Sequence, residues 1–154
     1  TGTLSLVPQV RKITRRPVIA AGGIAEVSGM RAAFTLGADA VQIGTAFLAC
    51  DESNCPQAHR EALFTPTAAR TRLSRRFTGR LARFMSTPLL EELETSPHAA
   101  LPFPLQAAFN RPVKAEGVKR HDAGLLPLYA GQAAPLIRHR DAASVMRELI
   151  AGLS

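Results

Sequence analysis

Two short apolar runs, each ended by a pair of small residues, constrain the fold of this chain more than any other feature. They occupy residues 18–21 and residues 40–43. Continuous apolar runs of this length are typical of strands that are buried on both faces, as in parallel sheets covered by helices. The repeat therefore predicts two short parallel strands in the interior of the protein.

The segment between the two runs has the pattern of a helix. Met30, Ala33 and Phe34 form an apolar stripe at helical spacing, and Gly37 stands where a glycine with positive φ commonly ends a helix. A strand, a helix and a second strand make a βαβ unit, whose strands are parallel. A further helix is predicted over residues 4–13, with Pro8 in its first turn. The first third of the chain is thus predicted to be α/β.

The small residues after the two runs indicate binding chemistry. Gly22 and Gly23 follow the first run, and Gly44 and Thr45 follow the second. Glycine permits positive φ and close approach of the backbone to a ligand, and free N–H groups in such turns form an anion site. Because the carboxyl ends of neighbouring parallel strands lie at the same edge of a sheet, the two turns are predicted to form one phosphate cradle.

The middle of the chain is predicted to consist of helical pieces and loops, without a further βαβ unit. Asn54 is expected to cap a helix that has Pro56 in its first turn. Thr87 is a favourable N-cap for a helix that begins at Pro88. Three prolines predict an extended connection over residues 98–112.

The last helix is predicted to begin after Asp141, whose side chain can cap it. Its apolar residues at helical spacing are Ala143, Met146, Ile150 and Leu153, which line one side. This helix is expected to close the chain.

Positive charge is concentrated in one stretch. The chain has 19 Lys and Arg against 12 Asp and Glu, a net charge of +7, which raises nucleic acid or an anionic substrate as a partner. Residues 65–84 hold arginines with Phe77 and Phe84 between them, and such a pattern can bind single-stranded nucleic acid. The alternative is an exposed or interface face whose two phenylalanines pack in the core. Because no recognised nucleic-acid module surrounds the stretch, we expect no nucleic-acid partner.

Cys50 and Cys55 are the only cysteines, and with His59 they have a spacing that could supply three metal ligands. Structural zinc takes four ligands, usually in closer pairs, so we expect ordinary thiols and no metal. Two cysteines are too few for a disulfide framework, which favours a reducing compartment. No apolar run approaches the roughly 20 residues that cross a bilayer. We therefore expect a cytoplasmic protein without a membrane partner.

Four segments resemble the nitronate monooxygenase family, formerly called 2-nitropropane dioxygenases. They are PVIAAGGI at residues 17–24, QIGTAFLAC at 42–50, FTGR at 77–80 and YAGQAA at 129–134. The first two segments also resemble the flavin-dependent enoyl-acyl carrier protein reductases and, more loosely, the inosine monophosphate dehydrogenases, whereas the last two favour the monooxygenases. The resemblance extends over nearly the whole chain.

The resemblance implies a TIM barrel that binds flavin mononucleotide (FMN), with an added helical lid. It also implies an enzyme that oxidises alkyl nitronates with O2 to carbonyl compounds and nitrite. In this barrel the cofactor phosphate is held by the loops after the seventh and eighth strands, which match Gly22, Gly23, Gly44 and Thr45 here. The resemblance further implies that Tyr129 borders the substrate pocket. A tyrosine that packs with a satisfied hydroxyl is the alternative.

Of the family's barrel, this chain matches only the last two strands, whereas a complete (β/α)8 barrel needs about 250 residues. The chain starts at Thr1, and we expect it to be a C-terminal fragment. Residues 1–50 would be the end of the FMN-binding barrel, residues 51–132 a helical and loop insertion, and residues 133–154 a helix returning to the barrel.

No catalytic residue is assigned to this chain, because the family's catalytic histidine lies upstream of the matching segment. The chain by itself is therefore expected to be inactive. Open strand edges favour association, including a homo-oligomer. The alternative functions are an FMN-dependent enoyl-acyl carrier protein reductase and a non-enzymatic, phosphate-binding barrel fragment.

Overall fold

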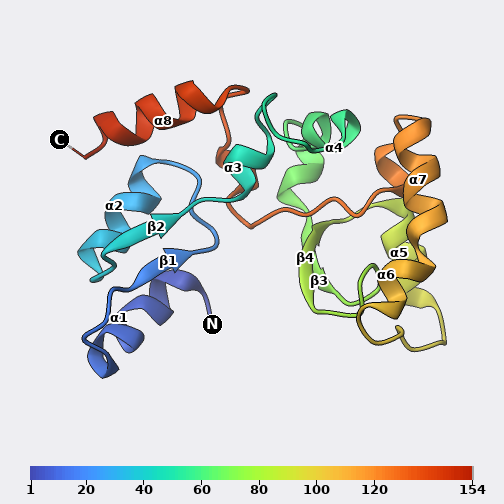
Figure 1. Ribbon diagram of the computed structural model, residues 1–154, viewed down its shortest axis with the longest axis horizontal. Helices are drawn as coiled ribbons and strands as arrows, with labels where there is room; N and C mark the ends of the chain where they lie inside the picture. Colours follow the sequence, from blue (N-terminus) through green and yellow to red (C-terminus); the bar gives the residue numbers. More distant parts are fainter. Residues whose placement is uncertain (154) are drawn as a thin grey trace. The chain divides into compact units, whose positions relative to one another are not determined.

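The computed structural model describes residues 1–153, and the chain divides into two compact units (Figure 1). Unit 1 comprises residues 1–54 and the segment from Gly131 onward, and unit 2 comprises residues 55–130. Each unit has its own two-stranded sheet and its own apolar core. Among the described residues, no helix is both long enough and apolar enough to cross a bilayer.

Unit 1 contains the predicted βαβ arrangement. Strands β1 (Ile19–Ala21) and β2 (Ala40–Gln42) are parallel neighbours. Helix α2 (Val27–Thr35) connects them, and Gly37 follows it with a φ of 100°. The parallel pair, the glycine at the helix end and the α/β class are thereby confirmed. The other helices of the unit are α1 (Thr3–Ile13), α3 (Thr45–Leu48) and α8 (Ala142–Ala151), with a 3-10 turn at Ala134–Leu136.

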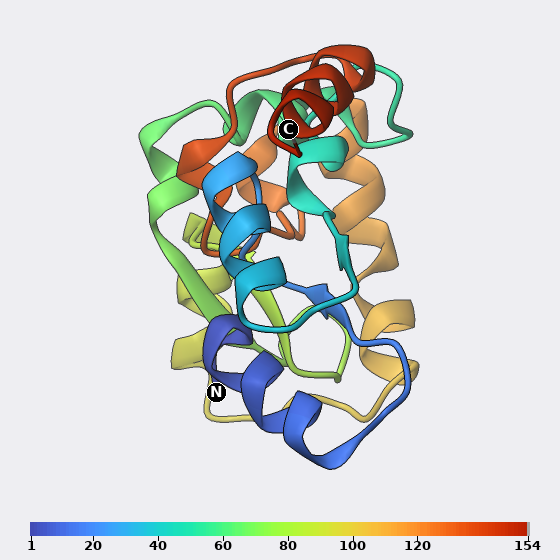
Figure 2. The ribbon, with the colours of Figure 1, turned by 90° about the vertical axis from the view of Figure 1, so that its left-hand side faces the viewer.

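The helices of unit 1 pack along one another and against the strands. Helix α2 lies between α1 and α8 (Figure 2), and α1 contacts β1 while α2 contacts β2. The core that they enclose includes Val7, Ala20, Met30, Ala33 and Leu149. The helix over residues 4–13 was predicted with Pro8 in its first turn, but α1 already begins at Thr3, so Pro8 lies in the second turn.

Asp39 fixes the entry to both strands of unit 1. Its Oδ2 accepts hydrogen bonds from the Val18 N–H at 2.7 Å and from Arg11 Nη1 at 3.2 Å. Its own N–H donates to the Val18 carbonyl at 2.8 Å. The residue before β2 therefore holds the residue before β1 and ties both to α1. This contact occupies the amino ends of the strands and leaves the carboxyl ends to the glycine turns.

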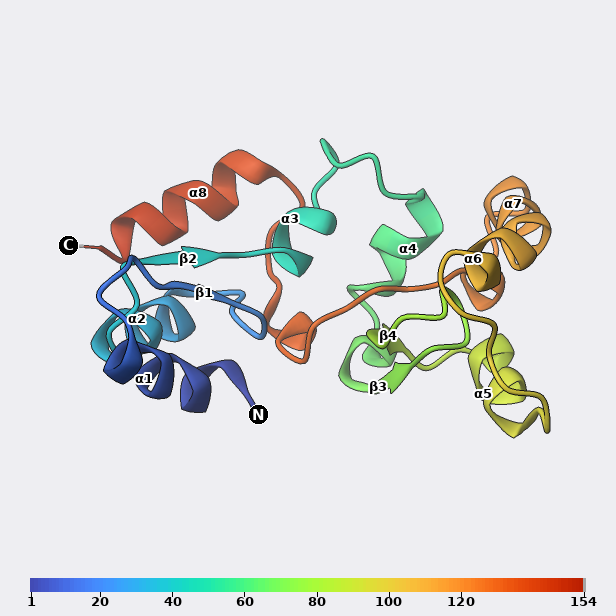
Figure 3. The same ribbon diagram turned by 60° about the horizontal axis from the view of Figure 1, so that its bottom comes forward.

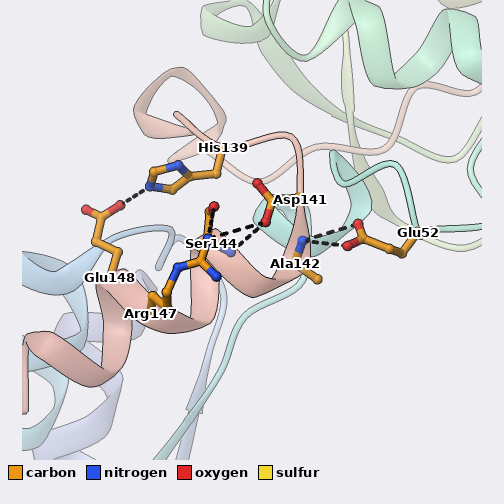
Figure 4. A network of polar contacts seen from close by, with 7 residues as sticks. All are labelled: Glu52, His139, Asp141, Ala142, Ser144, Arg147 and Glu148. Carbon is orange, nitrogen blue, oxygen red and sulfur yellow. Dashed lines mark hydrogen bonds and ion pairs between the residues drawn. The ribbon is translucent and has the colours of Figure 1, made fainter.

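Helix α8 begins in a polar network (Figure 4). Asp141 caps it as predicted, because its Oδ1 accepts a hydrogen bond from the Ser144 N–H at 2.7 Å. The Glu52 carboxylate accepts from the Ala142 N–H at 3.1 and 3.2 Å. The hydrogen bonds from Ser144 lower the pKa of Asp141. Two carboxylates thus satisfy N–H groups of the first turn, as helix N-termini require.

The apolar stripe predicted for α8 is not its buried face. Val145 and Leu149 are buried in the unit 1 core, whereas Met146, Ile150 and Leu153 are exposed. The exposed side chains instead line a surface groove together with residues of α2 and β2. Helical spacing alone could not choose between two apolar stripes on one helix, because neighbouring elements decide which of them is covered.

Unit 2 is built around an antiparallel pair, β3 (Thr71–Ser74) and β4 (Ala82–Met85). Figures 1 and 3 show α5, α6 and α7 on the same side of this pair. The helices are α4 (Gln57–Ala62), α5 (Pro88–Thr95), α6 (Leu105–Phe109) and α7 (Arg111–Lys119), with 3-10 turns at Pro66–Ala69 and Ala123–Leu125. The start of α5 at Thr87 and Pro88 is confirmed, and Thr87 accepts a hydrogen bond from the Leu90 N–H.

Two sequence predictions for unit 2 are wrong. The extended connection expected over residues 98–112 contains α6 and the start of α7. Pro104 and Pro112 stand at helix starts, where a backbone N–H would have no acceptor within the helix, so proline is tolerated there. Asn54 does not cap α4, since the N-cap position is Pro56 and the helix begins at Gln57. The β3–β4 pair was also not predicted.

The two phenylalanines of the arginine-rich stretch are core residues, as one of the two interpretations predicted. Phe77 is 4% exposed and Phe84 is 0% exposed, and their ring centroids lie 5.0 Å apart in an edge-to-face arrangement. Leu90 completes this cluster. The Arg80 guanidinium lies 4.0 Å from the centroid of the Phe103 ring, where a cation–π contact holds it. The absence of a nucleic-acid partner stays a prediction.

Candidate functional site

The turn after β1 has the backbone conformation that glycine permits. Gly22 has a φ of 104° and Gly23 a φ of 70°, which other residues adopt only with strain. A Cβ atom on Gly23 would meet no atom of the described residues within 4 Å, its chain neighbours aside. The turn therefore presents Gly23 to open space, as a ligand-binding turn requires.

The turn after β2 is built differently from the prediction. Gly44 has a φ of −104° and a ψ of −66°, so glycine is not required there for backbone geometry. A Cβ atom at this position would also meet no described atom within 4 Å outside its chain neighbours. Helix α3 begins directly afterwards at Thr45. What the two turns share is open space in front of a glycine rather than positive φ.

Gly131 joins the two turns, and the sequence reasoning missed it. Its N–H donates to Thr45 Oγ1 at 3.0 Å, although the two residues are 86 positions apart. A Cβ atom on Gly131 would lie 3.3 Å from Thr45 Oγ1 and 3.8 Å from the Gly23 nitrogen. Three segments of unit 1 thus converge on one point. The YAGQAA segment contained the signal, but only its tyrosine was taken as a site residue.

The convergence gathers hydrogen-bond donors. Within residues 1–153, the N–H groups of Gly23, Gly44 and Thr45 have no backbone or side-chain acceptor. The Thr45 oxygen accepts the Gly131 N–H, which leaves its hydroxyl proton to donate elsewhere. Several donors around a space that side chains leave open form an anion site. No cationic side chain is needed for such a site, because the backbone dipoles supply the positive field.

Tyr129 belongs to unit 2, and its place at the border of a substrate pocket stays a prediction. Its ring packs against Phe84, with centroids 4.6 Å apart at 43°. Its side chain also lines a cavity of about 260 Å³ within unit 2. Burial raises the pKa of the Tyr129 phenol, so the hydroxyl stays protonated and can donate a hydrogen bond. Tyr129 is therefore a packing residue and a cavity residue at once.

His59 is buried and holds the backbone beside this cavity. Its Nε2 lies 2.9 Å from the Tyr129 carbonyl oxygen and donates to it. Burial lowers the pKa of His59, the bond to Tyr129 opposes the shift, and the nearby Lys114 ammonium adds to it. His59 is accordingly a neutral structural residue. Cys50 and Cys55 are buried and form no disulfide, and residues 1–153 contain no cluster of three His, Cys, Asp or Glu side chains that could hold a metal.

We expect the stability of unit 2 to fall as the pH drops below the ordinary histidine value of about 6.5. The folded pKa of His59 lies below the unfolded one, so the unfolded chain binds a proton that the folded chain does not, and acid favours unfolding. Urea unfolding, followed through the fluorescence of Tyr129, the only tyrosine in a chain without tryptophan, measures this. His59→Gln keeps a donor for the Tyr129 carbonyl and should flatten the pH dependence. An unchanged slope in His59→Gln would assign it to other groups.

Comparison with known proteins places these features in a family. The family model described as nitronate monooxygenase matches residues 1–154. A probable nitronate monooxygenase of Bacillus subtilis is 37% identical over 131 residues, which are 85% of this chain and 38% of the relative. A nitronate monooxygenase of Pseudomonas aeruginosa is 39% identical over 150 residues, which are 97% of this chain and 43% of the relative. The chain thus spans about two-fifths of the length of these curated relatives.

Two solved structures resemble nearly the whole chain. A nitroalkane oxidase from Streptomyces ansochromogenes superposes with a TM-score of 0.91 at 42% identity, covering 99% of this chain and 43% of that one. FabK from Thermotoga maritima superposes with a TM-score of 0.77 at 32% identity, covering 97% of this chain and 48% of that one. The arrangement of elements described above therefore recurs within larger proteins.

Proposed function

The chain belongs to the nitronate monooxygenase family, and from this premise we propose that it supplies the phosphate-binding end of an FMN site in an enzyme that oxidises nitronates. The carrying observation is the convergence of Gly23, Gly44, Thr45 and Gly131 around open space with unpaired N–H donors. The β1–α2–β2 unit would form the last two strands of a (β/α)8 barrel, whose loops bind phosphate at this position.

The residues fit a phosphate group. A side chain at Gly23 or Gly44 would project into the space in front of the turns, so glycine at both positions keeps that space free for a ligand. The N–H groups of Gly23, Gly44 and Thr45 are available to donate. Hydrogen bonds from N–H groups to an anion are charge-assisted and stronger than neutral ones. Gly22 shapes the turn through its φ of 104°.

The chain's own part in the reaction is positional. Bound FMN supplies the oxidation of the nitronate and the reaction with O2. The Thr45 hydroxyl would donate a hydrogen bond to the phosphate, since its oxygen accepts from the Gly131 N–H, which orients the hydroxyl. No residue of this chain is given a proton transfer, and we propose that the chain alone does not turn over substrate. Cys50 and Cys55 form no disulfide, which supports the cytoplasm as the proposed compartment.

The phosphate proposal is tested by comparing FMN with riboflavin, which lacks the phosphate. We expect the protein to bind FMN measurably in equilibrium dialysis. Its affinity for riboflavin should be lower by about tenfold or more, since hydrogen bonds to charged groups each contribute about 1.5–3 kcal/mol. Inorganic phosphate should compete with FMN. Equal binding of the two flavins would overturn the proposal.

Gly44→Leu provides a variant that blocks the site without backbone strain, because φ at Gly44 is −104°. We expect it to weaken FMN binding about tenfold or more and to leave the melting temperature unchanged. The matched control is Gly2→Leu, which also places a side chain in open space at ordinary φ but at the start of α1. It should bind FMN as the unmodified protein does. Loss of binding in both variants would point to a general effect of added apolar surface.

The reaction itself is tested by placing this chain in the matching segment of the Pseudomonas aeruginosa nitronate monooxygenase, of which it covers 43%. We expect the hybrid to release nitrite from an alkyl nitronate while consuming O2. The similarity to FabK favours one other candidate, an FMN-dependent enoyl-acyl carrier protein reductase. Reduction of an enoyl thioester by a nicotinamide cofactor, without nitrite release, would establish that alternative.

A further inference from the structure

The β1–β2 sheet of unit 1 has one covered face and one open face. Ala20 is 2% exposed and belongs to the core that the helices enclose, and Val41 and Ile43 pack against that core. The residues between them point the other way, because successive side chains of a strand lie on opposite faces of a sheet. Ile19 is one of these residues, and it is 61% exposed. The open face is therefore the one that a ligand can reach.

Within β1 and β2, the open face carries a single polar side chain, that of Gln42. The register pairs Ile19 with Ala40 and Ala21 with Gln42, so these residues lie on the same face, and the first three have hydrocarbon side chains. Gln42 is exposed, and among residues 1–153 its amide has no hydrogen-bond partner. The small side chain of Ala21 leaves space beside it. The Gln42 amide can thus offer both a donor and an acceptor to a ligand.

Gln42 also stands next to the proposed phosphate site. It is the last residue of β2, and Gly44 follows it by two positions, immediately before Thr45. Two residues of extended chain span at most about 7 Å, so Gln42 lies at the same edge of the sheet as the N–H groups of that turn. Helices cover the other face of the sheet. The organic part of a phosphate ester held at this edge would therefore meet the open face, where the Gln42 amide is the first polar group.

An uncharged amide suits hydroxyl groups. Its oxygen accepts a hydrogen bond from one hydroxyl, and its NH2 group donates to another. A hydrocarbon chain in the same place would remove water from the amide without replacing the lost hydrogen bonds, which costs binding energy. Gln42 therefore favours a ligand with hydroxyl groups on the carbons that follow the phosphate.

We propose that Gln42 is a specificity-determining residue of this site: its amide binds hydroxyl groups on the carbon chain next to the phosphate, and it selects polyol phosphates over alkyl phosphates. The assignment rests on the proposed phosphate site. FMN meets the requirement, because a ribityl chain with hydroxyl groups joins its phosphate to its ring. Gln42 would thus contact the cofactor through that chain and leave the phosphate to the backbone N–H groups.

The test compares ribitol 5-phosphate with pentyl phosphate, which has the same number of carbons but no hydroxyl groups. Both are titrated against the protein without flavin, together with inorganic phosphate, and the NMR signals of the Gly23 and Gly44 N–H groups report binding. In Gln42→Met, a side chain of similar length replaces the amide. The ratio of the affinities for ribitol 5-phosphate and pentyl phosphate should fall about fivefold, as expected for one lost neutral hydrogen bond. The affinity for inorganic phosphate should not change. Gln42→Ala should lower the ratio in the same way.

Gln9→Met is the matched control, because it makes the same substitution on the surface of α1, where Gln9 Nε2 donates to the Ser5 carbonyl at 2.7 Å. It should keep the affinity ratio of the unmodified protein. An unchanged ratio in Gln42→Met and Gln42→Ala, with inorganic phosphate still bound, would overturn the role of Gln42 and leave the phosphate site standing. If none of the three probes shifted the Gly23 and Gly44 signals of the unmodified protein, the phosphate site would be refuted and the role of Gln42 with it.

Discussion

Replacing Gly79 with alanine is expected to destabilise unit 2 by about 3 kcal/mol or more. Gly79 has a φ of 86°, and a Cβ atom there would lie 2.5 Å from both the Leu101 oxygen and the Phe103 nitrogen. Both are backbone atoms, which cannot turn aside as a flexible side chain can. The added methyl group would force the 101–103 segment away from the loop that joins β3 to β4.

Urea unfolding followed by Tyr129 fluorescence measures the effect of Gly79→Ala on unit 2. Gly124→Ala is the matched control, since its Cβ would approach only the side chain of Asp122, with Oδ1 nearest at 3.0 Å, and its φ is ordinary. We expect it to cost less than about 1 kcal/mol. Gly79→Asn separates the two causes, because asparagine tolerates positive φ. If Gly79→Asn were as stable as the unmodified protein, backbone strain and not collision would be the cause.

Truncating Phe84 to alanine should cost about 3–5 kcal/mol of unfolding free energy. The side chain is 0% exposed and contacts two other rings, Phe77 at 5.0 Å and Tyr129 at 4.6 Å between centroids. Removing it leaves a cavity at the centre of the β3–β4 pair, and both aromatic contacts are lost. Because Tyr129 lies against Phe84, its fluorescence should also change in the folded state.

Phe109→Ala is the control for this truncation, since Phe109 is 71% exposed and its removal transfers little buried surface to water. We expect a loss below about 1 kcal/mol, with both variants compared in the same urea titration. A similar loss in the two variants would mean that the aromatic cluster is not the core of unit 2.

The sequence predicted the parts of the fold that depend on local patterns. The apolar runs before Gly22 and Gly44 became the parallel pair β1–β2, and the capping residues Thr87 and Asp141 each start a helix. Such signals act over a few residues, because a strand period or a cap is complete within its own segment. The same locality explains why the helix between the strands was predicted together with the glycine that follows it.

The β3–β4 pair could not be predicted in the same way. Arg72 and Leu73 are exposed while Ser74 is buried, so the polarity of β3 does not alternate as a half-buried strand should. The burial of Phe84 comes from ring contacts with Phe77 and Tyr129, the second of which lies far along the chain. Pairing of this kind is decided by tertiary packing, which a local pattern in a single sequence does not reveal.

Only the part of the candidate site that depends on local patterns could be predicted from the sequence. Gly22, Gly23, Gly44 and Thr45 follow strands, and strand ends are visible in the sequence. Gly131 reaches Thr45 from 86 positions away, and no local pattern marks that contact. The prediction that these positions bind the phosphate of FMN stays a prediction until the flavin comparison is made.

The ordinary backbone angles of Gly44 change what its presence in a sequence means. A mutation from glycine at position 79 is selected against by folding itself, because the chain collides with its own backbone. A mutation at position 44 meets no such barrier, since φ is −104° and the space beyond is open. Random drift could therefore place a side chain at position 44 in a protein that still folds. Selection would act against that substitution only if the site has to bind a ligand. In a sequence survey, position 79 would report whether a homologue keeps the fold, and position 44 whether it keeps the proposed phosphate site.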